Sequence, residues 1–269
     1  MQYEVIPQQI FKDLKQISQK MYDNSEQRNI DTFYYDFFLN VIYQIEAVNI
    51  LLAIGNDYAL DGIDRMAYES SIGFMVLNLD GFDSHEAVKF FEIKKIYELI
   101  KIKDGTIDKS SLISFEEANA AFRACFPDND RILRTIKDIV EEIANKIPMI
   151  NKNTWYQVFL NRSFVRVVEL IDKQVRQDFR DDWFTKLYPL FYKVASQGTH
   201  NLSVKTKYGQ RTLIPKSVRI MGESVLLSIT FSYFVRYFGN GIVKEESDDL
   251  LIYLKKIREQ AANDFKDKQ

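Results

Sequence analysis

The sequence predicts an all-α fold, organised as a single domain over residues 1–269. Apolar residues recur at spacings of three and four through most of the chain, and alternating strand-like segments are scarce. The chain contains 10 Gly and 5 Pro and has no long Ser- or Gly-rich run that would form a linker. Its 46% of hydrophobic residues can fill a substantial core. We therefore expect one multi-helix bundle.

The first part of the chain contains four expected helices. The turn signals Asp80-Gly81 and Asp104-Gly105 end the third and the fourth, and Ser84 is suited to cap the start of the fourth. The four helices are expected over residues 7–22, 30–54, 58–79 and 84–103.

A loop over residues 103–114 and a short helix ending at Cys125 come next. Pro127 and Pro148 then bracket a longer helix, because proline favours the start of a helix and disfavours its continuation. Further helices are expected over residues 129–147, 161–179, 183–196, 216–238 and 247–265. The exception is the segment 203–214, where Tyr208-Gly209 lies between two strand-like stretches and predicts a small β-hairpin.

Charge is distributed very unevenly along the chain. Between Asp182 and Glu245 the sequence has nine cations and a single acid, Glu223, although the net charge of the whole chain is −2. Such a segment is typical of a surface that binds RNA or another polyanion, or an acidic partner. The residues predicted to bind nucleic acid are Lys205, Lys207, Arg211, Lys216, Arg219, Arg162 and Arg166.

The last two of these belong to a helix with two distinct stripes. Its apolar stripe consists of Phe164, Val168, Ile171, Val175 and Phe179. The opposite stripe consists of Arg162, Arg166, Glu169, Lys173, Arg176 and Arg180. A solvated face is the commoner meaning of such a stripe, and its nearness to the basic segment adds the alternative of one shared electropositive surface.

The basic segment also contains a candidate catalytic group. Tyr192, Ser196 and His200 follow at four-residue spacing, so they share one face if the helix continues that far. A histidine beside cations titrates near neutral pH and can act as a general acid or base. The alternative is a helix-ending histidine that hydrogen-bonds a neighbouring helix, and Gly198 weakens the helix here.

A second candidate pair, Arg65 and Glu69, has the same spacing on an earlier helix. It forms either a buried ion pair that orients a third polar group or a simple helix-surface pair. Beside His200, Glu69 would fix the imidazole tautomer and Arg65 would bind a phosphate.

The sequence indicates neither a metal nor a cofactor. It contains no Walker loop, GxGxxG, HExxH, GxSxG or EF-hand pattern, and its one cysteine rules out a cysteine-based zinc site. His85 is expected to be solvated in the first turn of a helix. No charged and apolar leader opens the chain and no uninterrupted apolar run reaches about 18 residues, so we expect a cytoplasmic protein outside the membrane.

Two stretches carry a family resemblance. They are AVNILLAIGNDYALDGIDRMAYESSIGFMVLNLD, with Arg65 and Glu69, and WFTKLYPLFYKVASQGTHNL, with Tyr192, Ser196 and His200. In these the chain resembles a bacterial helical family, number fifty-six seventy-seven among the domains of unknown function. That family looks like a relative of the HEPN bundles, many of which are metal-independent ribonucleases or toxins of phage-defence systems.

The resemblance implies a HEPN-like bundle in which Arg65, Glu69, Ser196 and His200 form the polar signature. HEPN nucleases typically carry an arginine four to six residues before the histidine, whereas residues 194–199 here read VASQGT. A nuclease would therefore draw its arginine from another helix, and Arg65 is the best candidate.

Two functions follow as hypotheses. The first is metal-independent RNA cleavage in a bacterial defence system. The second is a non-catalytic sensor or interaction subunit of a defence system, with a basic surface that binds a nucleic acid or an acidic partner. For either function, the resemblance to HEPN bundles implies a homodimer or a partner subunit of a defence system. A nucleotide-binding bundle is a third alternative, suggested by the aromatic segments 33–38 and 231–238, although aromatic density is more typical of core packing.

Overall fold

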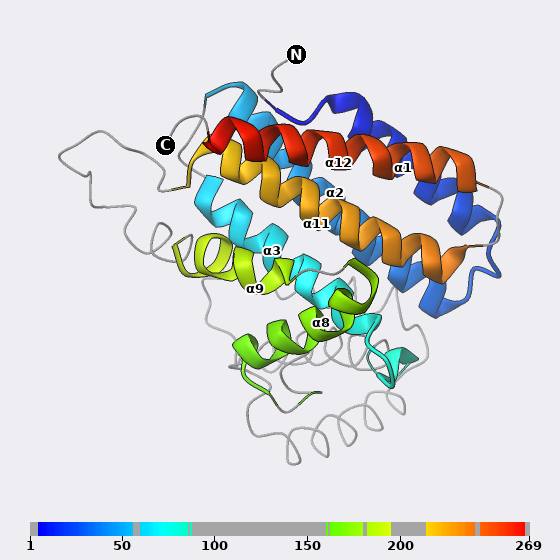
Figure 1. Ribbon diagram of the computed structural model, residues 1–269. Helices are drawn as coiled ribbons and strands as arrows, with labels where there is room; N and C mark the ends of the chain where they lie inside the picture. Colours follow the sequence, from blue (N-terminus) through cyan, green and yellow to red (C-terminus); the bar gives the residue numbers. More distant parts are fainter. Residues whose placement is uncertain are drawn as a thin grey trace, which may run out of the picture. The chain divides into compact units, whose positions relative to one another are not determined.

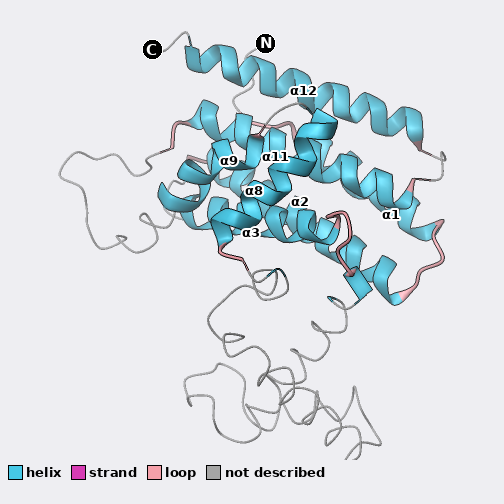
Figure 2. Cartoon of the chain, turned by 60° about the horizontal axis from the view of Figure 1, so that its bottom comes forward, coloured by secondary structure: helices cyan, strands magenta, loops and turns pink. Residues whose placement is uncertain are grey.

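A computed structural model describes residues 5–55, 60–85, 87, 160, 162–179, 182–194, 214–239 and 243–266. These residues are 85% helical and contain no strand (Figure 2), which confirms the all-α class. The predicted hairpin at 203–214 lies outside the described residues, apart from Ile214, and so do the helices expected between residues 88 and 159.

The chain divides into two compact units. The first comprises Met1–Phe82 and Ser163–Gln269, and the second comprises Asp83–Arg162. Every helix described below belongs to the first unit. The organisation into one domain therefore stays a prediction.

The helices of the first unit follow the predicted order. They are α1 (Gln8–Asp23), α2 (Asn29–Ala53), α3 (Leu60–Leu77), α8 (Phe164–Phe179), α9 (Trp183–Tyr188), η1 (Pro189–Val194), α11 (Lys216–Phe238) and α12 (Lys244–Lys266). The largest departure is at residues 183–196, expected as one helix, where the α-helix α9 passes into the π-helix η1. Pro189 stands at this junction and has no N–H to donate to a carbonyl one turn earlier, so the α-helical pattern is interrupted there.

Helix α11 forms the centre of the first unit. It contacts α1, α2, α3 and α12 (Figure 1), and its side chains are buried on nearly every side. Phe234 and Phe231 stack on Phe38 of α2, with ring centroids 4.4 and 6.0 Å apart. At Gly222 the helix has no side chain, and a Cβ there would lie 2.5 Å from the ring of Phe191. Helix η1 can therefore approach the backbone of α11 only because residue 222 is glycine.

Helix α8 has the two stripes that its sequence predicts. Phe164, Val168, Ile171 and Val175 are buried. The described members of the opposite stripe, Arg166, Glu169, Lys173 and Arg176, are exposed. A period of 3.6 residues thus placed the apolar side of this helix correctly.

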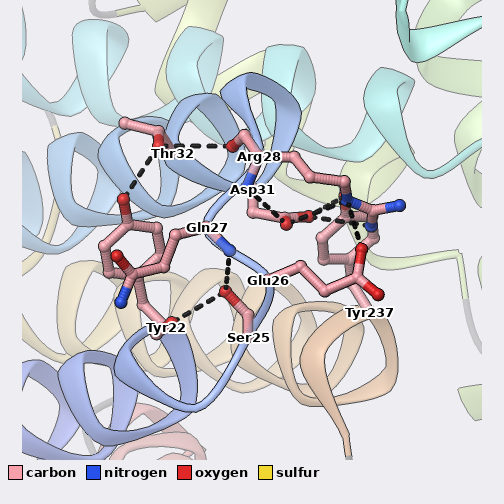
Figure 3. A network of polar contacts seen from close by, with 8 residues as sticks. All are labelled: Tyr22, Ser25, Glu26, Gln27, Arg28, Asp31, Thr32 and Tyr237. Atoms are coloured by element: carbon pink, nitrogen blue, oxygen red, sulfur yellow. Dashed lines mark hydrogen bonds and ion pairs between the residues drawn. The ribbon is translucent and has the colours of Figure 1, made fainter.

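The turn between α1 and α2 is fixed by the polar network in Figure 3. Asp31, in the first turn of α2, accepts hydrogen bonds from the backbone N–H of Arg28 at 3.0 Å and from its guanidinium at 3.1 Å. The hydroxyl of Tyr237, in α11, donates to the same carboxylate at 2.8 Å. Burial opposes the charge on Asp31, but these hydrogen bonds outweigh it and hold the pKa of Asp31 below its ordinary value. Burial, reinforced by Asp31, raises the pKa of Tyr237, so this hydroxyl remains a donor.

Asn49 ties the N-terminal segment to α2. Its side-chain amide accepts a hydrogen bond from the N–H of Ile6 and donates one to the carbonyl of Ile6, both at 2.7 Å. Asn49 is 3% exposed, so water cannot replace these bonds.

Replacing Asn49 by leucine is expected to lower the free energy of unfolding by about 1–3 kcal/mol, because it leaves the buried backbone groups of Ile6 without partners. Urea denaturation measures the change. Gln44→Leu on the same helix is the matched control, since the side-chain carbonyl of Gln44 is buried without a hydrogen bond among the described residues and its removal should cost little. Equal losses in the two variants would contradict the role assigned to Asn49.

Two of the described helices, α2 and α11, are long and apolar enough by composition to cross a membrane. In α11, 83% of the apolar window is buried within the protein, against 44% in α2. Core helices of proteins outside the membrane can have the same length and composition, so these two helices do not decide the location. The location outside the membrane stays a prediction.

Candidate functional site

Helix α3 carries the predicted pair Arg65 and Glu69 one turn apart. The Nε of Arg65 donates to Oε1 of Glu69 at 2.8 Å. The two side chains are 31% and 28% exposed, so the pair is neither a fully buried ion pair nor a free surface pair. Part of each side chain therefore lies at the surface.

Arg65 also contacts the second predicted motif. Its guanidinium carbon lies 4.9 Å from the centroid of the Tyr192 ring, which belongs to η1. Residues 65 and 192 are far apart in the sequence and are brought together because α3 packs against η1. Arg65 is predicted from the sequence to lie beside His200, which is outside the described residues, and the contact with Tyr192 leaves that placement a prediction.

Aromatic side chains surround this contact. Tyr192 stacks on Phe164 of α8 and on Tyr188 of α9, with ring centroids 4.3 and 5.2 Å apart and interplanar angles of 20° and 18°. The ammonium group of Lys193 lies 5.4 Å from the centroid of Tyr188. We call the six residues the aromatic–basic cluster: Arg65, Glu69, Phe164, Tyr188, Tyr192 and Lys193.

The environment keeps the arginine of this cluster charged. Partial burial opposes the charge, but the hydrogen bond and the charge of Glu69, followed by Tyr192, raise the pKa of Arg65 above its ordinary value. Burial, together with Tyr192, raises the pKa of Tyr188 as well, so its ring stays neutral at physiological pH. The site therefore places a charged guanidinium, paired with Glu69, beside the aromatic rings.

Polar contacts fix the segment that carries the two tyrosines. Asp172 of α8 accepts hydrogen bonds from the backbone N–H groups of Phe184 at 3.0 Å and Thr185 at 2.5 Å, which caps the start of α9. The hydroxyl of Tyr68 on α3 donates to the carbonyl of Phe184 at 2.7 Å. Burial raises the pKa of Asp172 above its ordinary value, although these N–H groups oppose the shift. Helices α3 and α8 thus both hold the beginning of α9.

Several predicted site residues lie outside the described residues. They are Ser196, His200, Lys205, Lys207 and Arg211. The proximity of His200 to Arg65 stays a prediction, as does the basic loop. Among the other predicted nucleic-acid contacts, Arg162, Arg166 and Lys216 are exposed, and Arg166 bonds Glu169 at 2.6 Å.

The assignment of Arg219 to an exposed basic surface is wrong. Its side chain is fully buried in α11. Its guanidinium donates through Nη1 to Oδ2 of Asp64 and through Nη2 to Oδ1 of Asp61, both on α3. An arginine enclosed in this way neutralises core carboxylates and cannot contact a phosphate at the surface.

Glu223 lies one helical turn beyond Arg219 and is also fully buried. Neither of its carboxyl oxygens has a hydrogen-bond partner among the described residues. Burial raises the pKa of Glu223 to about 8, although the charge of Arg219 lowers it. We call Asp61, Asp64, Arg219 and Glu223 the buried charge cluster.

The positions of the charged residues in the sequence indicate the buried charge cluster, whereas the number of cations in the segment does not. Arg219 and Glu223 are four apart in the strongly apolar helix VRIMGESVLLSITF, and Asp61 and Asp64 begin a helix rich in small and apolar residues. Charges at helical spacing within an apolar run indicate an ion pair in the core rather than a surface patch.

Among the described residues, no group of three or more His, Cys, Asp or Glu side chains is arranged to hold a metal ion. Comparison with known proteins gives no relationship: no protein-family model, no curated protein and no solved structure matches the chain. The class of the protein thus comes from its fold and its site alone: it is an all-α protein with a half-buried aromatic–basic cluster.

Proposed function

We propose that the protein is a metal-independent endoribonuclease of the HEPN-like kind, acting in a bacterial conflict or phage-defence system. The observation that carries the proposal is the contact of Arg65 with Tyr192, eight residues before His200. It supplies an arginine from α3 to a segment that has none just ahead of its histidine.

The chemistry requires a base, an acid and a cation. The ribose 2′-oxygen attacks the adjacent phosphorus, the bond from phosphorus to the 5′-oxygen breaks, and the products carry a 2′,3′-cyclic phosphate and a 5′-hydroxyl. His200 either takes the proton of the 2′-hydroxyl as general base or protonates the departing 5′-oxygen as general acid, and water supplies the other proton transfer. Arg65 stabilises the charge that develops on the phosphoryl oxygens. Glu69 orients Arg65 through its hydrogen bond, and Lys205, Lys207 and Arg211 hold the RNA backbone.

The test is incubation of the purified protein with a mixed RNA pool in EDTA, with the termini of the products identified. Wild-type protein should release fragments ending in cyclic phosphate. His200→Ala should slow cleavage by about 100-fold or more, and Arg65→Lys by about tenfold or more, because a lysine cannot present the planar pair of donors. All variants should retain the helical circular dichroism spectrum.

Arg236→Lys is the matched control for Arg65. Its guanidinium carbon also lies 4.9 Å from a tyrosine ring, that of Tyr233, but on the exposed side of α11. Cleavage by this variant should equal that of the wild type. Fragments that persist at the wild-type rate in His200→Ala would overturn the proposal.

A non-catalytic sensor or interaction subunit is the second candidate, and the bond between Arg65 and Glu69 favours it. An arginine that already has a carboxylate partner can have a purely structural role. In that case no variant cleaves RNA, and Arg65→Lys lowers the melting temperature through the lost contacts with Glu69 and Tyr192.

A further inference from the structure

We propose that the aromatic–basic cluster contains a stacking subsite for one unpaired RNA nucleotide, with Tyr188 as the residue that stacks on the base and Lys193 as the cation that meets the neighbouring phosphate. The inference rests on the proposed function, because it names a subsite of the same cluster and the class of RNA that fits it.

The geometry of the rings carries the inference. Tyr188 and Tyr192 are nearly parallel, and both are only half-buried. Phe164, 7% exposed, packs against both rings from α8 and supports them. A partly exposed ring on a fixed aromatic support presents a π-face to a flat apolar ligand, and nucleobases are such ligands.

The charges on either side indicate a nucleotide rather than an uncharged aromatic ligand. Lys193 is exposed and lies over Tyr188, and Arg65 lies over Tyr192, so a cation accompanies each of the two stacked rings. The one acid of the cluster, Glu69, is bound to Arg65. This arrangement matches a single strand, in which bases alternate with phosphates, because aromatic rings stack on bases and cations pair with phosphates.

The requirement for an unpaired base follows from the partner that it must stack on. A base in a duplex has both faces covered by its neighbours, and only an unstacked base can lie on a protein ring.

The position of the two tyrosines depends on η1, since the π-helix sets where Tyr192 falls after Tyr188. π-helical turns are frequent at functional sites.

The test measures binding rather than cleavage. Fluorescence anisotropy with a labelled single-stranded oligouridine, and with a duplex of the same length, is recorded in EDTA on the His200→Ala protein so that the RNA stays intact. We expect tighter binding of the single strand. Tyr188→Leu, which keeps apolar bulk but removes the ring, should weaken that binding about tenfold or more, and Tyr188→Phe should restore most of it.

Two further variants separate stacking from general effects. Tyr43→Leu is the matched control, because Tyr43 is an exposed tyrosine on α2 with Lys15 5.1 Å from its ring centroid, and it should leave binding unchanged. Lys193→Ala should weaken binding and reduce the slope of log affinity against log salt by about one contact. Lys193 is exposed, so this variant tests the subsite even if substitution of Tyr188 impairs folding.

The outcomes distinguish the subsite from the proposed cleavage. Equal binding of duplex and single strand, or an affinity that Tyr188→Leu leaves unchanged in the His200→Ala protein, overturns the subsite even if the wild-type protein cleaves RNA. Binding that depends on Tyr188, without any RNA cleavage by the wild type, supports the subsite and contradicts the proposed nuclease activity.

Discussion

Arg219→Met is expected to lower the free energy of unfolding by about 3–5 kcal/mol, the largest loss that we expect from a single substitution in this protein. The methionine fills most of the space of the arginine but leaves Asp61 and Asp64 in the core without the guanidinium that holds them. Urea denaturation followed by circular dichroism measures the loss.

Arg166→Met provides the comparison. Arg166 also forms an ion pair through its guanidinium, with Glu169 at 2.6 Å, but its side chain is 67% exposed. Water solvates both of its groups, so the loss should stay below about 1 kcal/mol. Similar losses for the two arginines would show that burial of Arg219 contributes nothing.

A rescue variant tests the cause. Converting Asp61 and Asp64 to asparagine in the Arg219→Met background removes the uncompensated charges. Part of the lost stability should return, because replacing a whole buried charge group costs less than breaking it. No recovery would indicate that Arg219 stabilises the core by packing rather than by charge.

Stability is expected to fall as the pH rises from about 4.5 to about 8, because Glu223 loses its proton more readily in the unfolded chain than in the core. The pKa of this carboxyl is raised from 4.5 to about 8 by burial. Between the two values the folded state holds a proton that the unfolded state has released, so each pH unit in this window costs about tenfold in the folding equilibrium constant. Above the folded pKa the contribution levels off.

Burial sets the direction of this shift, and the charge of Arg219 opposes it. Arg219, on the same helix, favours the ionised form, and Asp61 and Asp64 of α3 bind that arginine and offset its charge. With Glu223 neutral these four side chains carry one positive and two negative charges. Ionisation of Glu223 would add a third negative charge in the core, where Glu223 itself is fully buried.

Glu223→Gln tests the prediction, since glutamine resembles the protonated carboxyl and does not titrate. In urea unfolding at pH 5, 6, 7 and 8, the free energy of unfolding of the variant relative to that of the wild type should increase at each step. Glu259→Gln is the matched control on α12, where Glu259 is 57% exposed beside Lys255, and its difference from the wild type should be nearly constant. A Glu223→Gln difference that does not change with pH would contradict the prediction.

The sequence by itself determined the helical class and the faces of individual helices. In α8 the spacing of Phe164, Val168, Ile171 and Val175 was sufficient, because burial along a helix follows a fixed period. The spacing of Arg65 and Glu69 likewise placed them as neighbours one turn apart on a helix, and the structure shows the hydrogen bond between them.

Only the tertiary structure decided which charges are buried and which distant residues meet. Arg219 and Arg166 both belong to basic stretches of the sequence, and they differ because α3 covers Arg219 and contributes two carboxylates to it. Pro189 and Gly222 are inconspicuous in the sequence, yet one lies where α9 becomes η1 and the other admits Phe191. Such contacts between elements depend on how helices pack, and helical periodicity carries no information about that.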